Sequence, residues 1–228
     1  MQHNTIRRVR MKSAVAGLTA ALALTVAGCG SDSADPGDSG DGTQSVDVAA
    51  VPESVTWTPY QGVSVPYSSV DGPTTATVSA APTGYSHTPQ GAVLAAIQAQ
   101  TRLALAPDSS WPQVTASLVA PGAGRDAYSV ARAGASITTA ADPASTAAFA
   151  GFRVRDYTDD TAVLDLATTM PGGQLTSVPA TVLWRGDDWK LLLPEPDSGN
   201  DDGDIAAPAA TDPAELPSLD GFTAFSAS

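Results

Sequence analysis

The spacing of hydrophobic residues changes once along this chain, near Ala147, and this change limits the possible fold more than any other feature. Between residues 89 and 133, apolar side chains recur every three or four positions, as they do on one side of a helix. After Ala147 they alternate with polar side chains, as in a strand with one buried face. Helical segments followed by a run of strands predict an α+β domain.

The strongest helical pattern covers residues 89–105. Thr88 is a favourable N-cap, and Pro89 takes the first helical position, where the missing N–H costs nothing. Two shorter helices are predicted, one beginning near Ser110 and one over residues 124–133.

Four alternating runs follow, separated by the turn sequences Asp159-Asp160, Pro171-Gly172-Gly173 and Arg185–Asp188. Short connections of this kind predict a curved four-stranded antiparallel meander. Pro179 indicates that its strand has a bulge or lies at an edge. Residues 55–82 contain four prolines and favour short strands or an extended arm over a helix.

Acidic residues are concentrated outside residues 57–194. The formal net charge is −13, and without the four positive charges of residues 1–28 it is −17. Residues 30–56 hold six acids and residues 195–228 hold eight, with no base in either segment. Low apolar content and high charge are typical of disorder, so we expect an acidic tether over 29–54 and a mostly disordered tail over 195–228.

Within the tail, residues 216–225 (LPSLDGFTAF) are more apolar than their surroundings. A frayed tail is the favoured interpretation, and docking of this run onto the domain or onto a partner is the alternative. The domain itself is placed at residues 55–194. Its seven basic residues are scattered among ten acids, which argues against nucleic-acid binding, because phosphate neutralisation needs clustered Lys and Arg.

Residues 1–28 have the layout of an export signal. Arg7, Arg8, Arg10 and Lys12 precede an uncharged apolar run, 14–27, which is shorter than the ~20 residues that span a bilayer. Val26-Ala27-Gly28-Cys29 resembles the lipobox of bacterial lipoproteins. The resemblance implies that the Cys29 sulfur carries a diacylglycerol, that the chain is cut before it, and that the protein is anchored in the cell membrane on its extracytoplasmic face. An ordinary signal peptide with an incidental cysteine, or an uncut anchor, is the alternative.

The stretch His87-Thr88-Pro89-Gln90-Gly91-Ala92, with the surrounding residues 55–194, resembles an uncharacterised domain of exported actinobacterial proteins, some of which are linked to conjugal transfer. The predicted meander is similar to NTF2-like or cystatin-like cones and to the VirB8-type assembly domains of type IV secretion systems. These resemblances imply a cone-shaped sheet around the 89–105 helix and envelope proteins as partners. They imply no reaction.

The residues offer little for catalysis. His87 is the single histidine after residue 28, no Gly-x-Ser-x-Gly sequence occurs, and one histidine cannot form a usual zinc site. We expect His87, with Thr88 and Pro89, to have a structural role where the 89–105 helix begins. Arg125 and Asp126 are candidates for an ion pair or for a cleft lining. The aromatic residues that would border such a cleft are Trp57, Tyr85, Trp111 and Tyr128.

The sequence therefore predicts a non-catalytic, lipid-anchored envelope protein that acts through protein contacts, with no metal and no cofactor. A small-ligand-binding module that uses the hollow of the sheet is the runner-up. An enzyme with His87 as general base is a third possibility. A deep hollow would favour the ligand-binding module, and a filled one would favour protein contacts.

Overall fold

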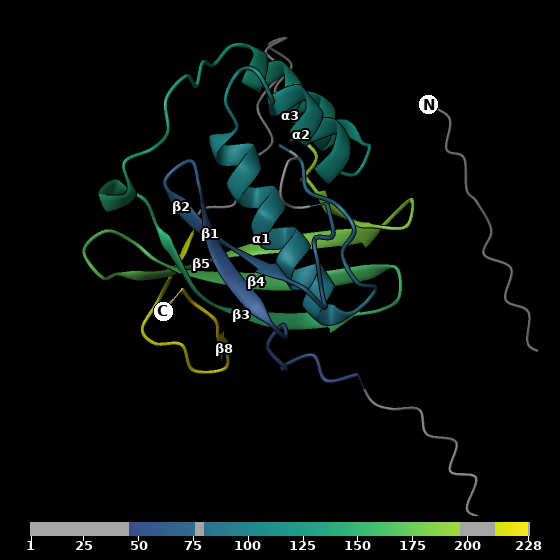
Figure 1. Cartoon of the computed structure of the whole chain (residues 1–228), viewed down its shortest axis with the longest axis vertical. Helices are drawn as coiled ribbons and strands as arrows, with labels where there is room; N and C mark the ends of the chain where they lie inside the picture. Colours follow the sequence, from purple (N-terminus) through teal and green to yellow (C-terminus); the bar gives the residue numbers. More distant parts are fainter. Residues whose placement is uncertain (1–45, 76–79, 197–212, 228) are drawn as a thin grey trace, which may run out of the picture. The chain divides into compact units, whose positions relative to one another are not determined.

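A β-hairpin precedes three α-helices, and the strands of an antiparallel sheet follow them, in the residues that the computed structural model describes: 46–75, 80–196 and 213–227 (Figure 1). This arrangement confirms the predicted α+β class. The elements are β1 (Val55–Tyr60), β2 (Val63–Ser68), α1 (Pro89–Leu105), α2 (Trp111–Leu118), α3 (Ala123–Ala133), a 3₁₀ turn (Pro143–Ser145), β3 (Ala148–Tyr157), β4 (Thr161–Thr169), β5 (Leu175–Trp184), β6 (Trp189–Leu192), β7 (Ala214–Leu216) and β8 (Thr223–Ala224).

Helix α1 begins where the sequence predicts. The Thr88 hydroxyl accepts a hydrogen bond from the Gly91 backbone N–H at 3.1 Å, and Pro89 occupies the first turn. This cap satisfies an N–H group that has no partner within the helix. Both later helices also lie close to their predicted positions, with Ser110 as the N-cap of α2.

Helix α1 packs against the hairpin on one side and against the sheet on another. The Gln98 side-chain amide donates to the Pro66 carbonyl of β2 at 2.8 Å, and that of Gln100 donates to the Pro179 carbonyl of β5 at 3.4 Å. Figure 1 shows α1 crossing the strands of the sheet. Because both sides are covered, α1 is buried nearly all round, whereas the sequence pattern predicts a single apolar stripe.

The sheet is larger than the predicted four-stranded meander. Among the described residues it has six strands, in the order β6-β5-β4-β3-β8, and β7 pairs with β5 beyond the end of β6. All pairs are antiparallel. Pairing of β5 with β4 is continuous through Pro179, which faces Asp165. On its other side β5 pairs with β7 at 175–177 and with β6 at 181–184, so Pro179 lies in the gap between them, where no N–H is needed.

The C-terminal segment 213–227 is part of the fold, which corrects the prediction of a frayed tail for these residues. Strand β8 pairs with Gly151 and Phe152 of β3, and β7 pairs with the start of β5. Phe225 is 8% exposed and belongs to the hydrophobic core. The apolar run 216–225 therefore docks on the domain, as the alternative interpretation proposes.

Residues 46–54, predicted as part of the tether, also contact the domain. The Gln90 side-chain amide donates to the carbonyls of Asp47 and Ala50, and the Thr223 hydroxyl donates to that of Ala49. The folded region thus extends beyond the predicted bounds 55–194 at both ends. The remainder of the predicted tether, residues 29–45, lies outside the described residues.

Candidate functional site

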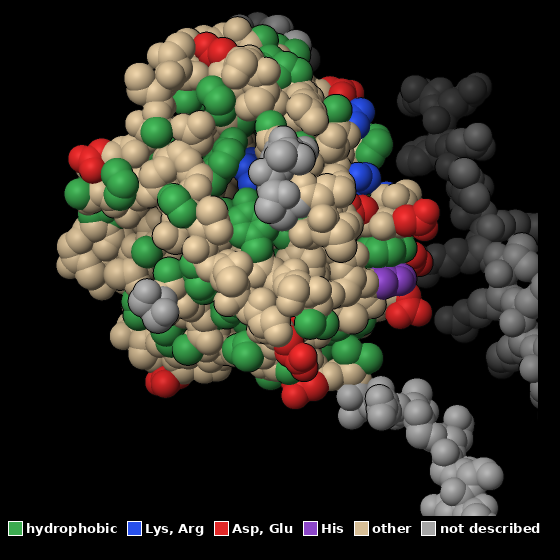
Figure 2. Space-filling model, in the orientation of Figure 1, with side chains coloured by type: hydrophobic (Ala, Val, Ile, Leu, Met, Phe, Trp, Pro, Cys, Tyr) green, Lys and Arg blue, Asp and Glu red, His purple; other side chains and the backbone are tan. Residues whose placement is uncertain are grey.

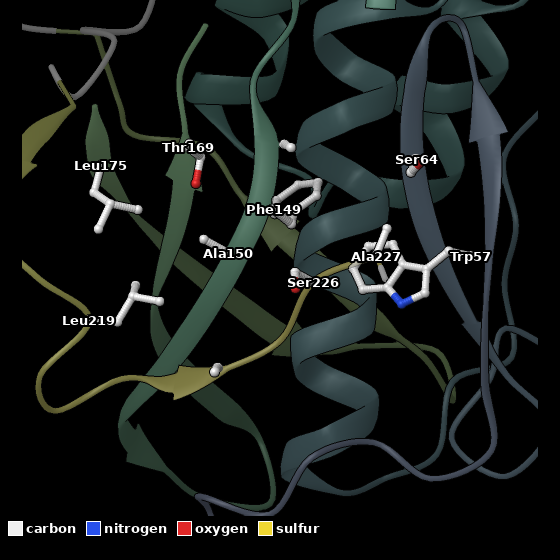
Figure 3. Close-up of a pocket in the computed structure, with 11 residues that line it drawn as sticks. Trp57, Ser64, Phe149, Ala150, Thr169, Leu175, Leu219, Ser226 and Ala227 are labelled. Atoms are coloured by element: carbon white, nitrogen blue, oxygen red, sulfur yellow. The ribbon is translucent and has the colours of Figure 1, made fainter. Parts of the chain in front are cut away.

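A pocket with a volume of about 330 Å³ lies between the hairpin, one end of the sheet and the C-terminal segment (Figure 3). In this view Leu175 and Leu219 lie on one side, Trp57 and Ser64 lie on the other, and Phe149 is between them. The lining residues are Trp57, Ser64, Ala148, Phe149, Ala150, Thr169, Leu175, Leu219, Ala224, Ser226 and Ala227.

The C-terminal segment forms its share of this pocket because two aromatic contacts hold it in place. The Phe225 ring lies 5.0 Å from the Trp57 ring and 5.9 Å from the Phe152 ring, measured between centroids. Gly151 lets β8 approach β3 closely, because a Cβ at this position would lie 2.7 Å from the Thr223 carbonyl oxygen. A short strand with two paired residues is thereby fixed by its side chains.

The pocket has the chemistry of an apolar recess. Its lining includes the hydroxyls of Ser64, Thr169 and Ser226, and none of the lining residues is charged. Such a lining can bury an apolar group and orient it with a few hydrogen bonds. It has no His, Asp, Glu, Lys or Cys that could act as an acid or base near neutral pH or activate these hydroxyls.

Of the predicted site residues, Trp57 is the one that lines this pocket. His87, Thr88 and Pro89 lie at the start of α1. The His87 ring stacks on Trp184, with centroids 3.9 Å apart and planes inclined by 6°, and contacts Trp189 edge-on. Its Nε2 is bonded to the Asp159 carbonyl. These contacts join the start of α1 to the end of β5 and to the turn at Asp159.

The other predicted residues do not meet in one cleft lining. Tyr85 is buried in the core. Trp111 begins α2 and lies 5.6 Å from the guanidinium of Arg132, and the Tyr128 hydroxyl on α3 donates to the Leu103 carbonyl at 2.7 Å. Arg125 and Asp126 belong to the first turns of α3. Neither takes part in the ion pairs of the described residues, which are Arg132–Asp108, Arg153–Asp165 and Arg155–Asp165.

Two buried carboxylates tie loops together. Asp188 accepts hydrogen bonds from the backbone N–H groups of Gly84, Tyr85 and Trp189, at 3.0 to 3.1 Å. Asp71 accepts from the Glu53 N–H at 3.0 Å and from the Ser86 hydroxyl at 3.1 Å. Both oxygens of each carboxylate accept hydrogen bonds from the chain, which suits loop fixation better than proton transfer.

The residues with shifted pKa values lie outside the pocket lining, and local hydrogen bonds or burial cause the shifts. The Ile137 N–H, the Ser136 hydroxyl and Arg132 donate to Asp108 and lower its pKa to about 2. Burial raises the pKa of Tyr85 well above its ordinary value, and also raises the pKa values of Tyr128 and Tyr157. Over the face seen in Figure 2, acidic side chains are dispersed, and the basic side chains at its right-hand edge lie beside acidic ones.

Within the described parts of the chain, no cluster of three or more His, Cys, Asp or Glu side chains is suited to hold a metal ion. The helices in these parts are too short or too polar to cross a membrane. Cys29, the predicted lipidation site, lies outside the described residues.

Sequence reasoning did not single out the pocket residues Phe149, Leu175 and Leu219. It also did not single out Phe225, which supports the pocket through Trp57. The apolar character of residues 216–225 is the signal that points to two of them.

No curated protein and no solved structure gives a significant match to the chain. A family model does match, over residues 23–224, and it ends at the last residue of β8. The chain belongs to this family, which is described as a domain of unknown function, DUF8175.

Proposed function

We propose that this protein is a lipid-anchored component of the cell envelope that works by binding another envelope protein and catalyses no reaction. The anchor is a diacylglycerol on Cys29, and the folded domain stands on the extracytoplasmic side of the membrane. The basic and apolar segments before Cys29 and the small residues Ala27 and Gly28 support the anchor. Two or more acyl chains give stable attachment, which a single chain does not.

The observation that carries this proposal is that helix α1 fills the face of the sheet on which a hollow would lie. In NTF2-like cones the hollow of the sheet is the natural place for a small ligand. Here Ala92, Val93 and Ala96 of α1 pack with Leu164 and Val182 of the sheet in one core, and all five are fully buried. A filled sheet face supports a domain that presents its outer surface to a partner.

Within that surface, the pocket beside Trp57 offers an apolar recess for a side chain of the partner. It lies next to β8, an edge strand of the sheet with two paired residues. A conjugation or secretion-type assembly is the specific partner class, on the strength of the sequence resemblance. The His87 contacts support the non-catalytic part of the proposal, because one face of the ring stacks on Trp184 and Nε2 is bonded to the Asp159 carbonyl.

A small-ligand-binding module is the second candidate, and the volume of the pocket favours it. About 330 Å³ falls at the lower end of the range for small-molecule pockets, ~300–1,000 Å³. The lining lacks a charged group that would select a polar ligand, so an apolar ligand is the class that fits.

Membrane fractionation tests the anchor. Cys29→Ala should leave the protein in the soluble fraction or as an uncut precursor, whereas Ser33→Ala, a matched change in the same segment, should behave like the wild type. If Cys29→Ala stays in the membrane fraction and is cut at the same place, the lipid anchor is wrong.

Cross-linking in intact cells tests the partner. Leu219→Arg places a charge in the pocket, and Val130→Arg places one at an exposed apolar position of α3. We expect an envelope protein to cross-link to the wild type and to Val130→Arg. This cross-link should be lost with Leu219→Arg. Equal cross-linking of all three would exclude the pocket, and cross-linking of no envelope protein would count against the partner function itself.

A further inference from the structure

Arg102, in the last turn of α1, is buried without an acid beside it. Its exposed fraction is 2%. The ion pairs in the described residues belong to Arg132, Arg153 and Arg155, and none includes Arg102. Burying an ionised guanidinium away from water costs free energy that an opposite charge normally offsets. The position of Arg102 therefore requires an explanation.

The contacts that Arg102 does make use only part of its hydrogen-bonding capacity. Its Nη2 donates to the Tyr67 hydroxyl at 2.9 Å, and its guanidinium lies over the Tyr60 ring, 4.0 Å from the centroid. In the described structure Nε and Nη1 are buried with no hydrogen-bond partner. A ring face stabilises the charge but does not accept these N–H groups in line.

Three further buried polar atoms near this side of α1 also lack partners in the part of the chain that is described: the Tyr60 hydroxyl, the Tyr85 hydroxyl and Gln98 Oε1. Tyr60 touches Arg102 directly. Gln98 lies one helical turn earlier, and its amide donates to Pro66, the neighbour of Tyr67. The positive charge of Arg102 also acts on Tyr85, where it lowers the pKa against the larger effect of burial.

The unused groups are mostly donors. Arg102 has N–H groups on Nε and Nη1, each phenol has one O–H, and Gln98 Oε1 is the single pure acceptor among them. A partner that supplies several acceptors and a negative charge would satisfy these groups together. Oxygen atoms of a carboxylate or phosphate group meet both requirements, and a guanidinium binds them with particularly favourable geometry.

We propose that Arg102 is the anchor of a binding site for a small oxyanion between α1 and the β1–β2 hairpin, with Tyr60 and Tyr85 as hydroxyl donors. The unpartnered atoms are sealed from solvent, so the hairpin must separate from α1 to admit the anion. Among the described residues the hairpin is a two-stranded sheet of its own, and the Gln98–Pro66 and Arg102–Tyr67 hydrogen bonds that join it to α1 would break in this movement. The site does not involve the lipid anchor, but the hairpin also carries Trp57 and Ser64 of the pocket, so its movement would alter that pocket.

Thermal unfolding of the purified full chain in detergent tests the site. The melting temperature is measured against increasing sodium phosphate, sulfate and acetate, with sodium chloride at matched ionic strength as the reference. A ligand that binds the folded state raises the melting temperature in a saturable manner. We expect this rise with at least one oxyanion and not with chloride, and the comparison of phosphate with acetate tells which oxyanion class fits.

Arg102→Met should abolish the oxyanion-dependent rise, because it removes the charge and keeps an unbranched side chain. Arg125→Met is the matched control and should keep the rise. Since Arg102→Met changes a buried position, Tyr85→Phe provides a milder second variant that removes one hydroxyl. Loss of one hydrogen bond to a charged ligand should weaken the apparent affinity on the order of tenfold.

Two results would overturn the site. One is a melting temperature that rises no more with any oxyanion than with chloride, which leaves water or the Tyr60 ring as the partner of Arg102. The other is an oxyanion response that Arg102→Met and Tyr85→Phe both retain in full, which would indicate binding elsewhere on the surface.

Discussion

The rings of His87 and Trp184 lie face to face, 3.9 Å apart between centroids and inclined by 6°. His87 precedes α1 and Trp184 ends β5, so the stack fastens the start of the helix to the sheet. The Tyr157 hydroxyl adds a hydrogen bond to the His87 carbonyl at 3.3 Å. The histidine that the sequence marks as the one candidate base is in this way part of an aromatic cluster.

Replacing His87 should therefore affect stability. His87→Ala removes the stack and the bond to Asp159, and we expect a loss of about 1 kcal/mol in the free energy of unfolding. His87→Phe keeps a flat ring and should lose less. Urea unfolding followed by tryptophan fluorescence measures both. Equal losses for the two variants would show that the stack contributes nothing.

Asp188 and its neighbour Asp187 make a matched pair. Asp188→Asn replaces an acceptor of three backbone N–H groups with an amide that can accept fewer, and should cost about 2 kcal/mol in unfolding free energy. Asp187 is exposed and has a positive φ of 61°, a conformation that asparagine also tolerates. Asp187→Asn should leave stability within about 0.5 kcal/mol of the wild type. Chemical denaturation of the two variants gives the comparison, and a similar cost at both positions would contradict the role of Asp188.

The contribution of the C-terminal segment can be measured with two phenylalanines, three residues apart. Phe225 is buried between Trp57 and Phe152, and truncating a buried phenylalanine costs about 3–5 kcal/mol. Phe222 lies half-buried over the Arg153 guanidinium, so Phe222→Ala should cost about 1 kcal/mol. Thermal or urea unfolding of both variants is the measurement. If Phe225→Ala unfolds like the wild type, the segment does not stabilise the domain.

Stability should decline at alkaline pH because of Tyr85. Burial raises its pKa in the folded protein, whereas the unfolded chain ionises near the ordinary value of 10. The unfolded state therefore loses a proton first, and the free energy of unfolding falls as the pH rises above about 10. Tyr85→Phe should reduce this fall. Unfolding midpoints of both proteins are measured from pH 9 upward. An equal decline in the wild type and in Tyr85→Phe would contradict this role of Tyr85.

Asp108 should show the opposite dependence in acid. Its pKa is lowered from 3.8 to about 2 in the folded protein, so its contribution is fully present above pH 4 and is lost as the pH falls toward 2. Asp108→Asn removes the titrating group, and its stability relative to the wild type should improve over this range. The direction, rather than the size, is the test, because the carboxylate is open to solvent. Acid unfolding of both proteins is followed by circular dichroism. A difference in stability between them that stays constant as the pH falls would contradict this role of Asp108.

The sequence determines the elements whose signals are local. Thr88 and Pro89 define the start of α1 within a single turn, and the alternation after Ala147 defines the strands, because caps and side-chain periods act between near neighbours. The α+β class follows from the order of these elements.

Only the tertiary structure decides which distant segments meet. Strand β8 has two paired residues, and its place beside Gly151 depends on the docking of Phe225 against Trp57 and Phe152, which no local pattern encodes. Arg102 reads as a polar position on a helix, and it is buried because the hairpin covers the second side of α1. Burial of a side chain depends on every segment packed around it, and for both residues those segments are far away in the sequence.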